Sequence, residues 1–224
     1  MRSFFLLFLS AALLPECADA QHILYAVPGG DIAGNGDFQI IGKTGDNLMI
    51  YKNTGNYSPA IVIYDRDMQL KQKILLKFLP PRLISVDFIA YPEKVLVFYQ
   101  YYHKKKVFCY ASTLNSNGRL MGPPVLIDES TVSSSGASTD AFTIISSEDK
   151  QKIMVFIIKK QQESTVYHIF TAWLDKDLHF LQRKDNSLRV PDEEDIPANF
   201  LLSNKGSLVF EVIGKDNADN SLIT

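Results

Sequence analysis

Short apolar runs, each ended by turn residues, recur along most of this chain. The clearest stretch spans residues 87–128, where four runs rich in β-branched and aromatic residues alternate with clusters of Asn, Gly, Pro and Lys. After residue 20, no long segment has apolar residues at the spacing of an amphipathic helix. Short runs of this kind, separated by turn residues, are typical of β-strands. The pattern therefore predicts an all-β fold.

Two landmarks in this pattern repeat along the chain. The predicted first strands carry phenylalanines, namely Phe38, Phe88, Phe142 and Phe200. The turns after the predicted third strands share an Asx-x-Asx pattern, namely Asp65-Arg66-Asp67, Asn115-Ser116-Asn117 and Asp175-Lys176-Asp177. Both landmarks recur about every 50–60 residues, which predicts one repeated supersecondary unit. We place the four-stranded units near residues 38–80, 85–128 and 142–184, and an incomplete unit at 199–224.

A four-stranded sheet cannot bury both of its faces alone, but radial stacking of successive sheets buries them and leaves only short edges. On these repeats, the chain resembles a β-propeller of the general WD40 or kelch kind across residues 21–224. The resemblance concerns architecture only, because the Trp-Asp and double-glycine signatures of those families do not recur. It implies a propeller of four-stranded antiparallel blades. A β-sandwich with coincidental spacing is the alternative.

The predicted units amount to about three and a half blades, whereas closed propellers have about four to eight. One interpretation is that the chain is the N-terminal part of a larger propeller. The other is that a first strand at residues 23–27 pairs with the last unit and helps to close a small ring. We favour the first interpretation. In both, the last sheet has an open edge, which predicts self-association through that edge.

The first 20 residues have the features of a secretory signal peptide. Arg2 precedes a short apolar run, and Ala18 and Ala20 form a small-x-small cleavage site that leaves Gln21 as the new N-terminus. We therefore expect a secreted, periplasmic or cell-surface protein, with residues 21–224 as its repeat domain. No later apolar run has the roughly 18 residues typical of a transmembrane helix, so none is expected in the mature chain.

Cleavage would also remove Cys17 and leave Cys109 as the single cysteine. A secreted chain with no internal disulfide fits a bacterial envelope better than a small eukaryotic secreted module. The formal net charge is −2, so there is no basic surplus of the kind that attracts nucleic acid. The expected partner is thus an unidentified protein or glycan.

Four polar or aromatic features could carry a function, but each has a structural explanation. The Asx-x-Asx sites lack the ligand spacing of a calcium loop, and Asp and Asn stabilise tight turns by bonding to their own backbone. The acidic run at 192–195 is expected to be a solvated loop, and the basic run at 103–106 a charged hairpin turn. Tyr99, Tyr101 and Tyr102 could stack on sugar rings, although packing between blades is the favoured interpretation.

Motifs of enzymatic catalysis are missing from the sequence. There is no Gly-x-Ser-x-Gly elbow, phosphate-binding loop or dinucleotide fingerprint, and the four histidines have no metal-ligand spacing. We therefore assign no catalytic, cofactor-binding or metal-binding residue and expect no cofactor. The sequence favours a non-enzymatic binding or scaffold module of unknown ligand. The alternative is the N-terminal part of a propeller-containing hydrolase, either a glycosidase or a peptidase.

Overall fold

The computed structural model describes residues 37–54, 58–132, 141–215 and 221–223. All regular structure in these ranges is β-strand, in three four-stranded sheets and one three-stranded sheet. None of these residues belongs to a helix that could span a membrane. The predicted cleavage site at Ala18, Ala20 and Gln21 and the predicted strand at 23–27 lie outside the described residues.

Each sheet is an antiparallel meander whose strand order follows the chain. The first sheet contains β1 (Asp37–Thr44), β2 (Asn47–Thr54), β3 (Ser58–Tyr64) and β4 (Leu70–Leu75). The second contains β5 (Leu83–Ala90), β6 (Lys94–His103), β7 (Lys106–Asn115) and β8 (Val125–Thr131). The third contains β9 (Thr143–Ser146), β10 (Lys152–Lys160), β11 (Val166–Asp175) and β12 (Phe180–Arg189). The fourth contains β13 (Ile196–Leu202), β14 (Leu208–Lys215) and β15 (Ser221–Ile223).

Successive sheets pack face to face, and three apolar clusters fill the spaces between them. Met49 and Ile61 of the first sheet share a cluster with Val97 of the second. The opposite face of the second sheet contributes Phe98 to a cluster with Val155 of the third. A smaller cluster joins Phe156 of the third sheet to the fourth. Side chains alternate between the two faces along each strand. A sheet can therefore present one group of apolar side chains to the sheet before it and another group to the sheet after it.

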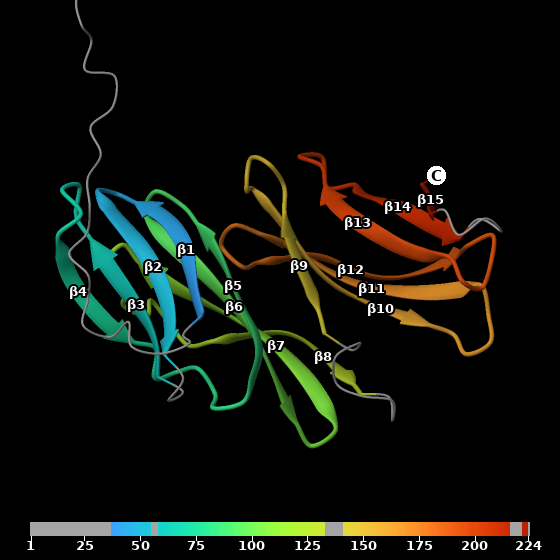
Figure 1. Cartoon of the computed structure of the whole chain (residues 1–224), viewed down its shortest axis with the longest axis horizontal. Helices are drawn as coiled ribbons and strands as arrows, with labels where there is room; N and C mark the ends of the chain where they lie inside the picture. The colour runs from blue at the N-terminus through green and yellow to red at the C-terminus, as the bar shows by residue number, and fades with distance from the viewer. Residues whose placement is uncertain (1–36, 55–57, 133–140, 216–220, 224) are drawn as a thin grey trace, which may run out of the picture.

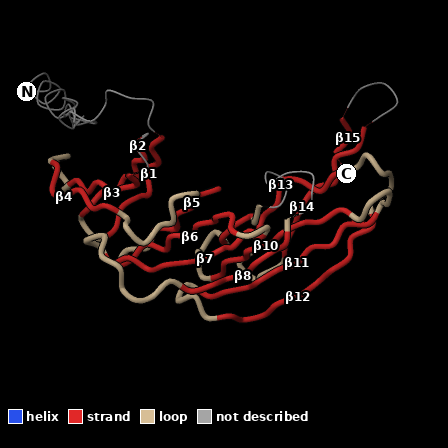
Figure 2. The backbone as a smooth tube through the Cα atoms, turned by 90° about the horizontal axis from the view of Figure 1, so that it is seen from below, coloured by secondary structure: helices blue, strands red, loops and turns tan. Residues whose placement is uncertain are grey.

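The first strands of neighbouring sheets also lie close together, since β1 contacts β5 and β9 contacts β13. Sheets that stack in sequence, with their first strands on the inside, are the blades of a β-propeller. The propeller prediction is therefore confirmed, and the sandwich alternative is wrong. In the part of the chain that the structure describes, the sheets follow an open arc (Figures 1 and 2).

The boundaries of the last two units differ from the prediction. β12 runs on to Arg189, whereas the third unit was predicted to end near residue 184. These polar residues form a strand because β11 is equally long and pairs with them through Val166↔Arg189, and an outermost strand tolerates exposed side chains. β13 begins at Ile196 and includes Pro197, a residue that sheets accept on edge strands. The short β15 adds a third strand to the expected half blade.

Candidate functional site

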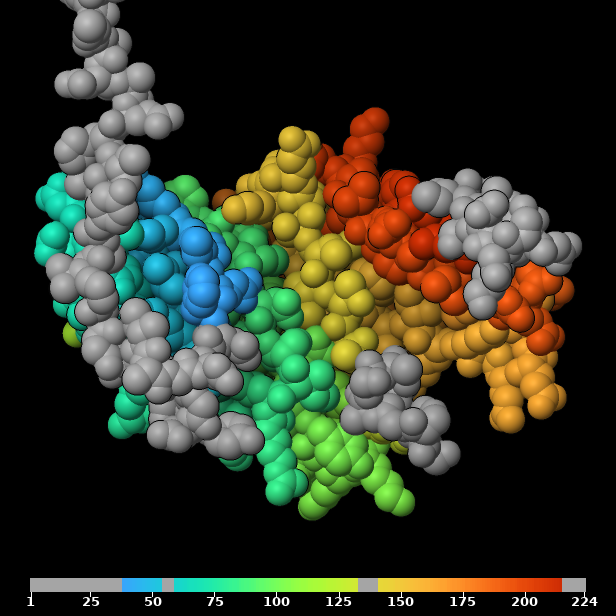
Figure 3. Space-filling view, viewed as in Figure 1, coloured from blue at the N-terminus to red at the C-terminus, as the bar shows by residue number. Residues whose placement is uncertain are grey.

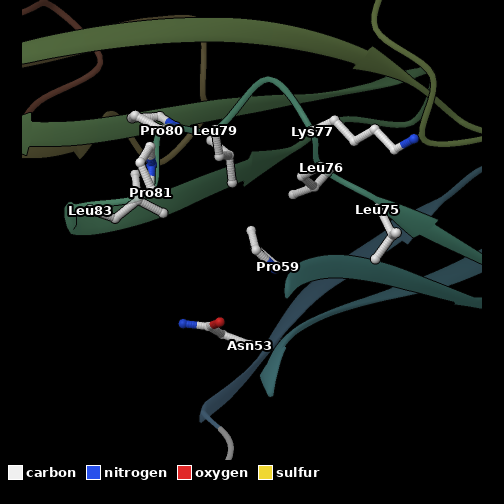
Figure 4. Close-up of a pocket in the computed structure, with 9 residues that line it drawn as sticks. All are labelled: Asn53, Pro59, Leu75, Leu76, Lys77, Leu79, Pro80, Pro81 and Leu83. Atoms are coloured by element: carbon white, nitrogen blue, oxygen red, sulfur yellow. The ribbon is translucent and has the colours of Figure 1, made fainter. Parts of the chain in front are cut away.

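The main candidate site is a hollow at the junction of the first and second sheets. It has a volume of about 360 Å³, and its lining residues are Asn53, Pro59, Leu75, Leu76, Lys77, Leu79, Pro80, Pro81 and Leu83 (Figure 4). These residues come from the ends of β2, β3 and β4, from the start of β5 and from the crossing segment between the two sheets. The lining is therefore mostly leucine and proline, with one amide and one ammonium group.

The crossing segment is held in place by local interactions. The Leu76 backbone N–H donates to the Pro59 carbonyl at 2.8 Å, and the Leu79 N–H donates to the Leu76 carbonyl at 3.1 Å. The side chains of Leu76 and Leu79 are buried in the core between the first two sheets. Pro80 and Pro81 follow, and they lack the N–H that would continue regular pairing. These residues fix one wall of the hollow.

Asn53 supplies the polar group of the opposite wall (Figure 4). Its side-chain Oδ1 is buried, and no described residue forms a hydrogen bond with it. Leaving a buried acceptor unpaired costs about 1–3 kcal/mol. Such groups are few in native proteins, and each calls for an explanation. A ligand N–H that reached Oδ1 would supply the missing partner.

A row of stacked rings, the aromatic ladder, lies next to the hollow on β6 and β7. It comprises Tyr99, Tyr110, Tyr101 and Phe108, whose successive ring centroids are 5.8, 5.9 and 5.5 Å apart. The angles between the ring planes are only 14–24°. Leu83 of the hollow pairs with Tyr101 in the sheet register. Leu83 of the hollow and Tyr101 of the aromatic ladder are therefore neighbours on one face of the second sheet.

The expected packing role holds for Tyr99 and Tyr101, which pack in the cluster between the first two sheets, but not for Tyr102. Tyr99 is buried, and its burial raises its pKa to about 12, so the hydroxyl stays neutral. Tyr102 lies on the opposite face of β6, because side chains alternate along a strand, and it is 40% exposed. Because each ring turns a face toward its neighbour, most ring faces are occupied. A platform that stacks on sugars needs free ring faces.

The Asx-x-Asx sites are hairpin turns, as predicted. At the first, Asp65 Oδ1 accepts hydrogen bonds from the backbone N–H groups of Asp67 and Gln69, at 3.0 and 2.8 Å. Asn115 and Asp175 accept the corresponding pairs of bonds in the second and third sheets. Each side chain thus closes the turn between the third and fourth strands of its blade.

The acidic run at 192–195 is less solvated than expected. Asp195 is buried, and its Oδ2 accepts a hydrogen bond from the Asp192 N–H at 2.9 Å. Its backbone carbonyl accepts the Tyr167 hydroxyl at 2.8 Å. These bonds fold the run into a tight turn against the third sheet, and they give Asp195 a structural role. The basic run at 103–106 is the predicted hairpin turn, with Lys104 and Lys105 at positive φ.

Sequence reasoning missed Asp87, a carboxylate on the inner strand β5. Burial raises its pKa, although a hydrogen bond from Ser85 acts in the opposite direction. A raised pKa on an inner strand is a property of a general acid. Canonical glycoside hydrolysis needs two carboxyl groups, however. Asp128 acts on the same buried thiol as Asp87, since burial and both carboxylates raise the pKa of Cys109, and no group of three His, Cys, Asp or Glu side chains among the described residues could hold a metal ion.

The comparisons with known proteins reveal likeness only at the level of architecture. The sequence matches no family model and no curated protein. Among solved structures, an endo-arabinase from Bacteroides thetaiotaomicron superposes with a TM-score of 0.46 and 14% identity, over 88% of this chain and 78% of that one. The WD40 domain of SCAP from fission yeast superposes with a TM-score of 0.31 and 12% identity, over 84% of this chain and 47% of that one.

Proposed function

We propose that this chain is a non-enzymatic binding module that holds an extended segment of a partner protein against the hollow and the aromatic ladder. The observation that carries the proposal is the Oδ1 of Asn53, which is unpaired among the described residues and lies in a mostly apolar hollow. An apolar side chain of the partner would fill the hollow, while a backbone N–H of the same segment would donate to Asn53. Ligand pockets commonly combine apolar walls with a few polar groups that fix orientation.

The chemistry of the lining favours a peptide over a glycan. A sugar presents many hydroxyl groups, whereas the described lining of the hollow offers just two polar side chains, Asn53 and Lys77, to pair with them. The rings of the aromatic ladder stack on one another and leave little free face for a sugar. The hydrolase alternative has less support at this site, because the described lining of the hollow contains no carboxylate for paired acid–base chemistry.

Peptide and glycan arrays test the proposal. The peptides would be extended, each with one branched aliphatic or aromatic residue at its centre. We expect the purified chain to bind a subset of these peptides. Leu75→Arg should weaken that binding by about tenfold or more, because it brings a charge into an apolar site. Leu181→Arg is the matched control, since Leu75 and Leu181 are 50% and 51% exposed.

The arrays give clear contrary outcomes. Binding to glycans alone, or to neither array, would overturn the proposal. An equal loss of peptide binding in the Leu75 and Leu181 variants would show that the hollow is not the site. Circular dichroism of both variants would establish that each is folded before binding is compared.

We further propose that the module acts in the periplasm or outside the cell, based on the signal-peptide pattern of residues 1–20. Mass spectrometry of the chain expressed in a bacterium should find Gln21 at the N-terminus. Ala20→Arg should block that cleavage, because the site needs a small residue. Recovery of the intact precursor from the cytoplasm of the unmodified strain would contradict the proposed location.

A further inference from the structure

Another hollow lies at the junction of the third and fourth sheets, where the fourth sheet, coloured red in Figure 3, packs over the third. Its volume is about 190 Å³. We call it the tryptophan hollow, and its lining residues are Met154, Thr171, Trp173, Gln182, Lys184, Asn186, Gly206 and Leu208. They come from β10, β11 and β12, from β14 and from the turn before β14. None of them lines the hollow between the first and second sheets.

The lining changes from apolar to polar across the third sheet. Met154 pairs with Trp173 in the sheet register, and Trp173 pairs with Gln182, so these three side chains share one face. At Met154 this face is buried against the fourth sheet. On β12 the same face carries Gln182, Lys184 and Asn186, which are all exposed. A ligand in the tryptophan hollow would therefore meet an apolar floor and a polar rim.

Lys184 differs from its charged neighbours on β12. Arg183 and Asp185 point to the opposite face of the sheet and have partners there. Arg183 Nη1 lies 3.4 Å from Asp128 Oδ1. Asp185 Oδ1 lies 3.6 Å from His168 Nδ1. The Lys184 ammonium group forms no ion pair with a described residue, and the described lining of the tryptophan hollow contains no carboxylate that could act as its counter-ion.

Trp173 brings an unpaired donor to the same place. Its Nε1 is buried, and no described residue forms a hydrogen bond with it. Two contacts hold the indole in position: Lys152 Nζ lies 5.8 Å from the ring centroid, and Gly206 is so close that a Cβ there would lie 1.9 Å from Cζ2. Buried donors without partners are few in native proteins, and each calls for an explanation. A ligand oxygen would supply the missing acceptor.

The lining groups favour a carboxylate as the ligand. Lys184 Nζ and Trp173 Nε1 can only donate hydrogen bonds, and the amides of Gln182 and Asn186 also have N–H groups to donate. A carboxylate accepts at both of its oxygens, and its hydrogen bonds to an ammonium group are stronger than those between neutral groups. An apolar cavity of about 150 Å³ holds a benzene molecule, so about 190 Å³ has room for an acid of about six carbons.

From these observations we propose that the tryptophan hollow binds a small organic acid. One carboxylate oxygen accepts a hydrogen bond from Lys184 Nζ and the other from Trp173 Nε1, while the hydrocarbon part lies on Met154. Gln182, the cross-strand partner of Trp173, is exposed and flexible, so it can move aside to admit the oxygen. The proposal does not depend on peptide binding at the junction of the first and second sheets.

Fluorescence titration tests this site directly, because Trp173 is the single tryptophan of the chain. Hexanoate is the probe, and hexanamide is a neutral counterpart of nearly the same size. Hexanoate should change the tryptophan emission in a saturable way. Hexanamide should bind about tenfold more weakly, because it cannot form an ion pair with the ammonium group.

Lys184→Met should weaken hexanoate binding by about tenfold or more, because methionine keeps an apolar stem but removes the charge. The affinity for hexanamide should stay the same. Lys104→Met is the matched control, since Lys104 is also exposed but lies in the turn between β6 and β7 of the second sheet. Neither exposed lysine should be needed for folding, and circular dichroism would establish that both variants are folded.

Several results would overturn the proposal. They are the absence of a saturable response to hexanoate, equal affinities for hexanoate and hexanamide, and an equal loss of affinity in the Lys184 and Lys104 variants. A stronger response to glucose than to hexanoate would indicate a sugar site instead. Calorimetric titration of the same samples adds a further check, because hexanoate binding without a change in emission would place the ligand away from Trp173.

Discussion

The side-chain amide of Gln100 forms two hydrogen bonds with the backbone of Phe142, a residue of the next sheet. Gln100 Nε2 donates to the Phe142 carbonyl at 2.7 Å, and Gln100 Oε1 accepts from the Phe142 N–H at 2.6 Å. Both residues are buried, with 1% and 4% of their surface exposed. The amide therefore takes the place of a strand partner just before β9 begins, and it fixes where the third sheet starts against the second.

Gln100→Leu should destabilise the fold. Leucine keeps most of the side-chain volume but leaves the Phe142 N–H and carbonyl buried without partners, at a cost of about 1–3 kcal/mol for each group. Urea unfolding followed by circular dichroism would measure the change in the free energy of unfolding. Gln182→Leu is the control, because Gln182 is exposed on β12. Equal free energies for the two variants would contradict the bridging role.

Gly206→Ala should also destabilise the fold. Gly206 has a φ of +93°, and a Cβ there would lie 1.9 Å from Cζ2 of Trp173. The clash and the strained backbone are expected to cost about 1–3 kcal/mol. Trp173 is the single tryptophan, so its fluorescence reports the transition directly. Gly122→Ala is the matched control, because a Cβ at Gly122 meets nothing within 4 Å, and no loss of stability is expected there.

Asp175 should make stability depend on pH in acid. Partial burial acts to raise its pKa, but hydrogen bonds from His179 and Asp177 outweigh it, and the net pKa is lowered. A carboxyl whose pKa is lower in the folded state contributes stability above the unfolded pKa of about 3.9, and it loses this contribution as the pH falls through the folded pKa. Asp175→Asn keeps an acceptor oxygen, so its unfolding free energy should change less than the wild-type value across that range. A parallel acid dependence in both proteins would refute this.

Cys109 should be unreactive while the protein is folded. Its thiol is fully buried on β7, and burial raises its pKa well above the usual value, so little thiolate forms at neutral pH. Ellman's reagent should therefore label the mature chain only after denaturant is added. Rapid labelling without denaturant would mean that β7 opens in the native state.

Asn53→Leu should separate binding from stability. Leucine removes the unpaired buried acceptor, so the free energy of unfolding should stay constant or rise by up to about 1–3 kcal/mol. Binding to the array peptides should weaken, because their N–H donor loses its acceptor. If Asn53 were only structural, the substitution would lower stability instead. Fluorescence unfolding and peptide titration on the same preparation would distinguish these results.

The turn landmarks of the sequence proved more reliable than the phenylalanine landmarks. Asp65, Asn115 and Asp175 all bond to backbone N–H groups two and four residues later. That geometry depends on a few neighbouring residues, so a local pattern can predict it. The phenylalanines are not equivalent in the same way. Phe38 is 71% exposed, whereas Phe142 is buried and lies one residue before β9.

The candidate site could not be read from the sequence, because distant residues build it. Asn53 and Leu83 line the same hollow only because the first sheet packs against the second. The Pro80-Pro81 pair was recognisable as a break in regular structure, but nothing local indicated that it forms a wall. The strand alternation did place Tyr99 and Tyr101 on one face. Their stacking with Tyr110 depends on the register between β6 and β7.

The packing of each sheet on its neighbours in sequence also affects the order in which the sheets unfold. Each apolar cluster joins only consecutive sheets, as in repeat proteins whose stability is a sum over units and nearest-neighbour interfaces. Within the described part of the chain, the second and third sheets have two such interfaces, whereas the first and fourth have one. Opening an end sheet therefore breaks a single interface and leaves the rest intact. The chain should fray from its ends inward, and its central pair of sheets should be the last to exchange amide hydrogens with solvent.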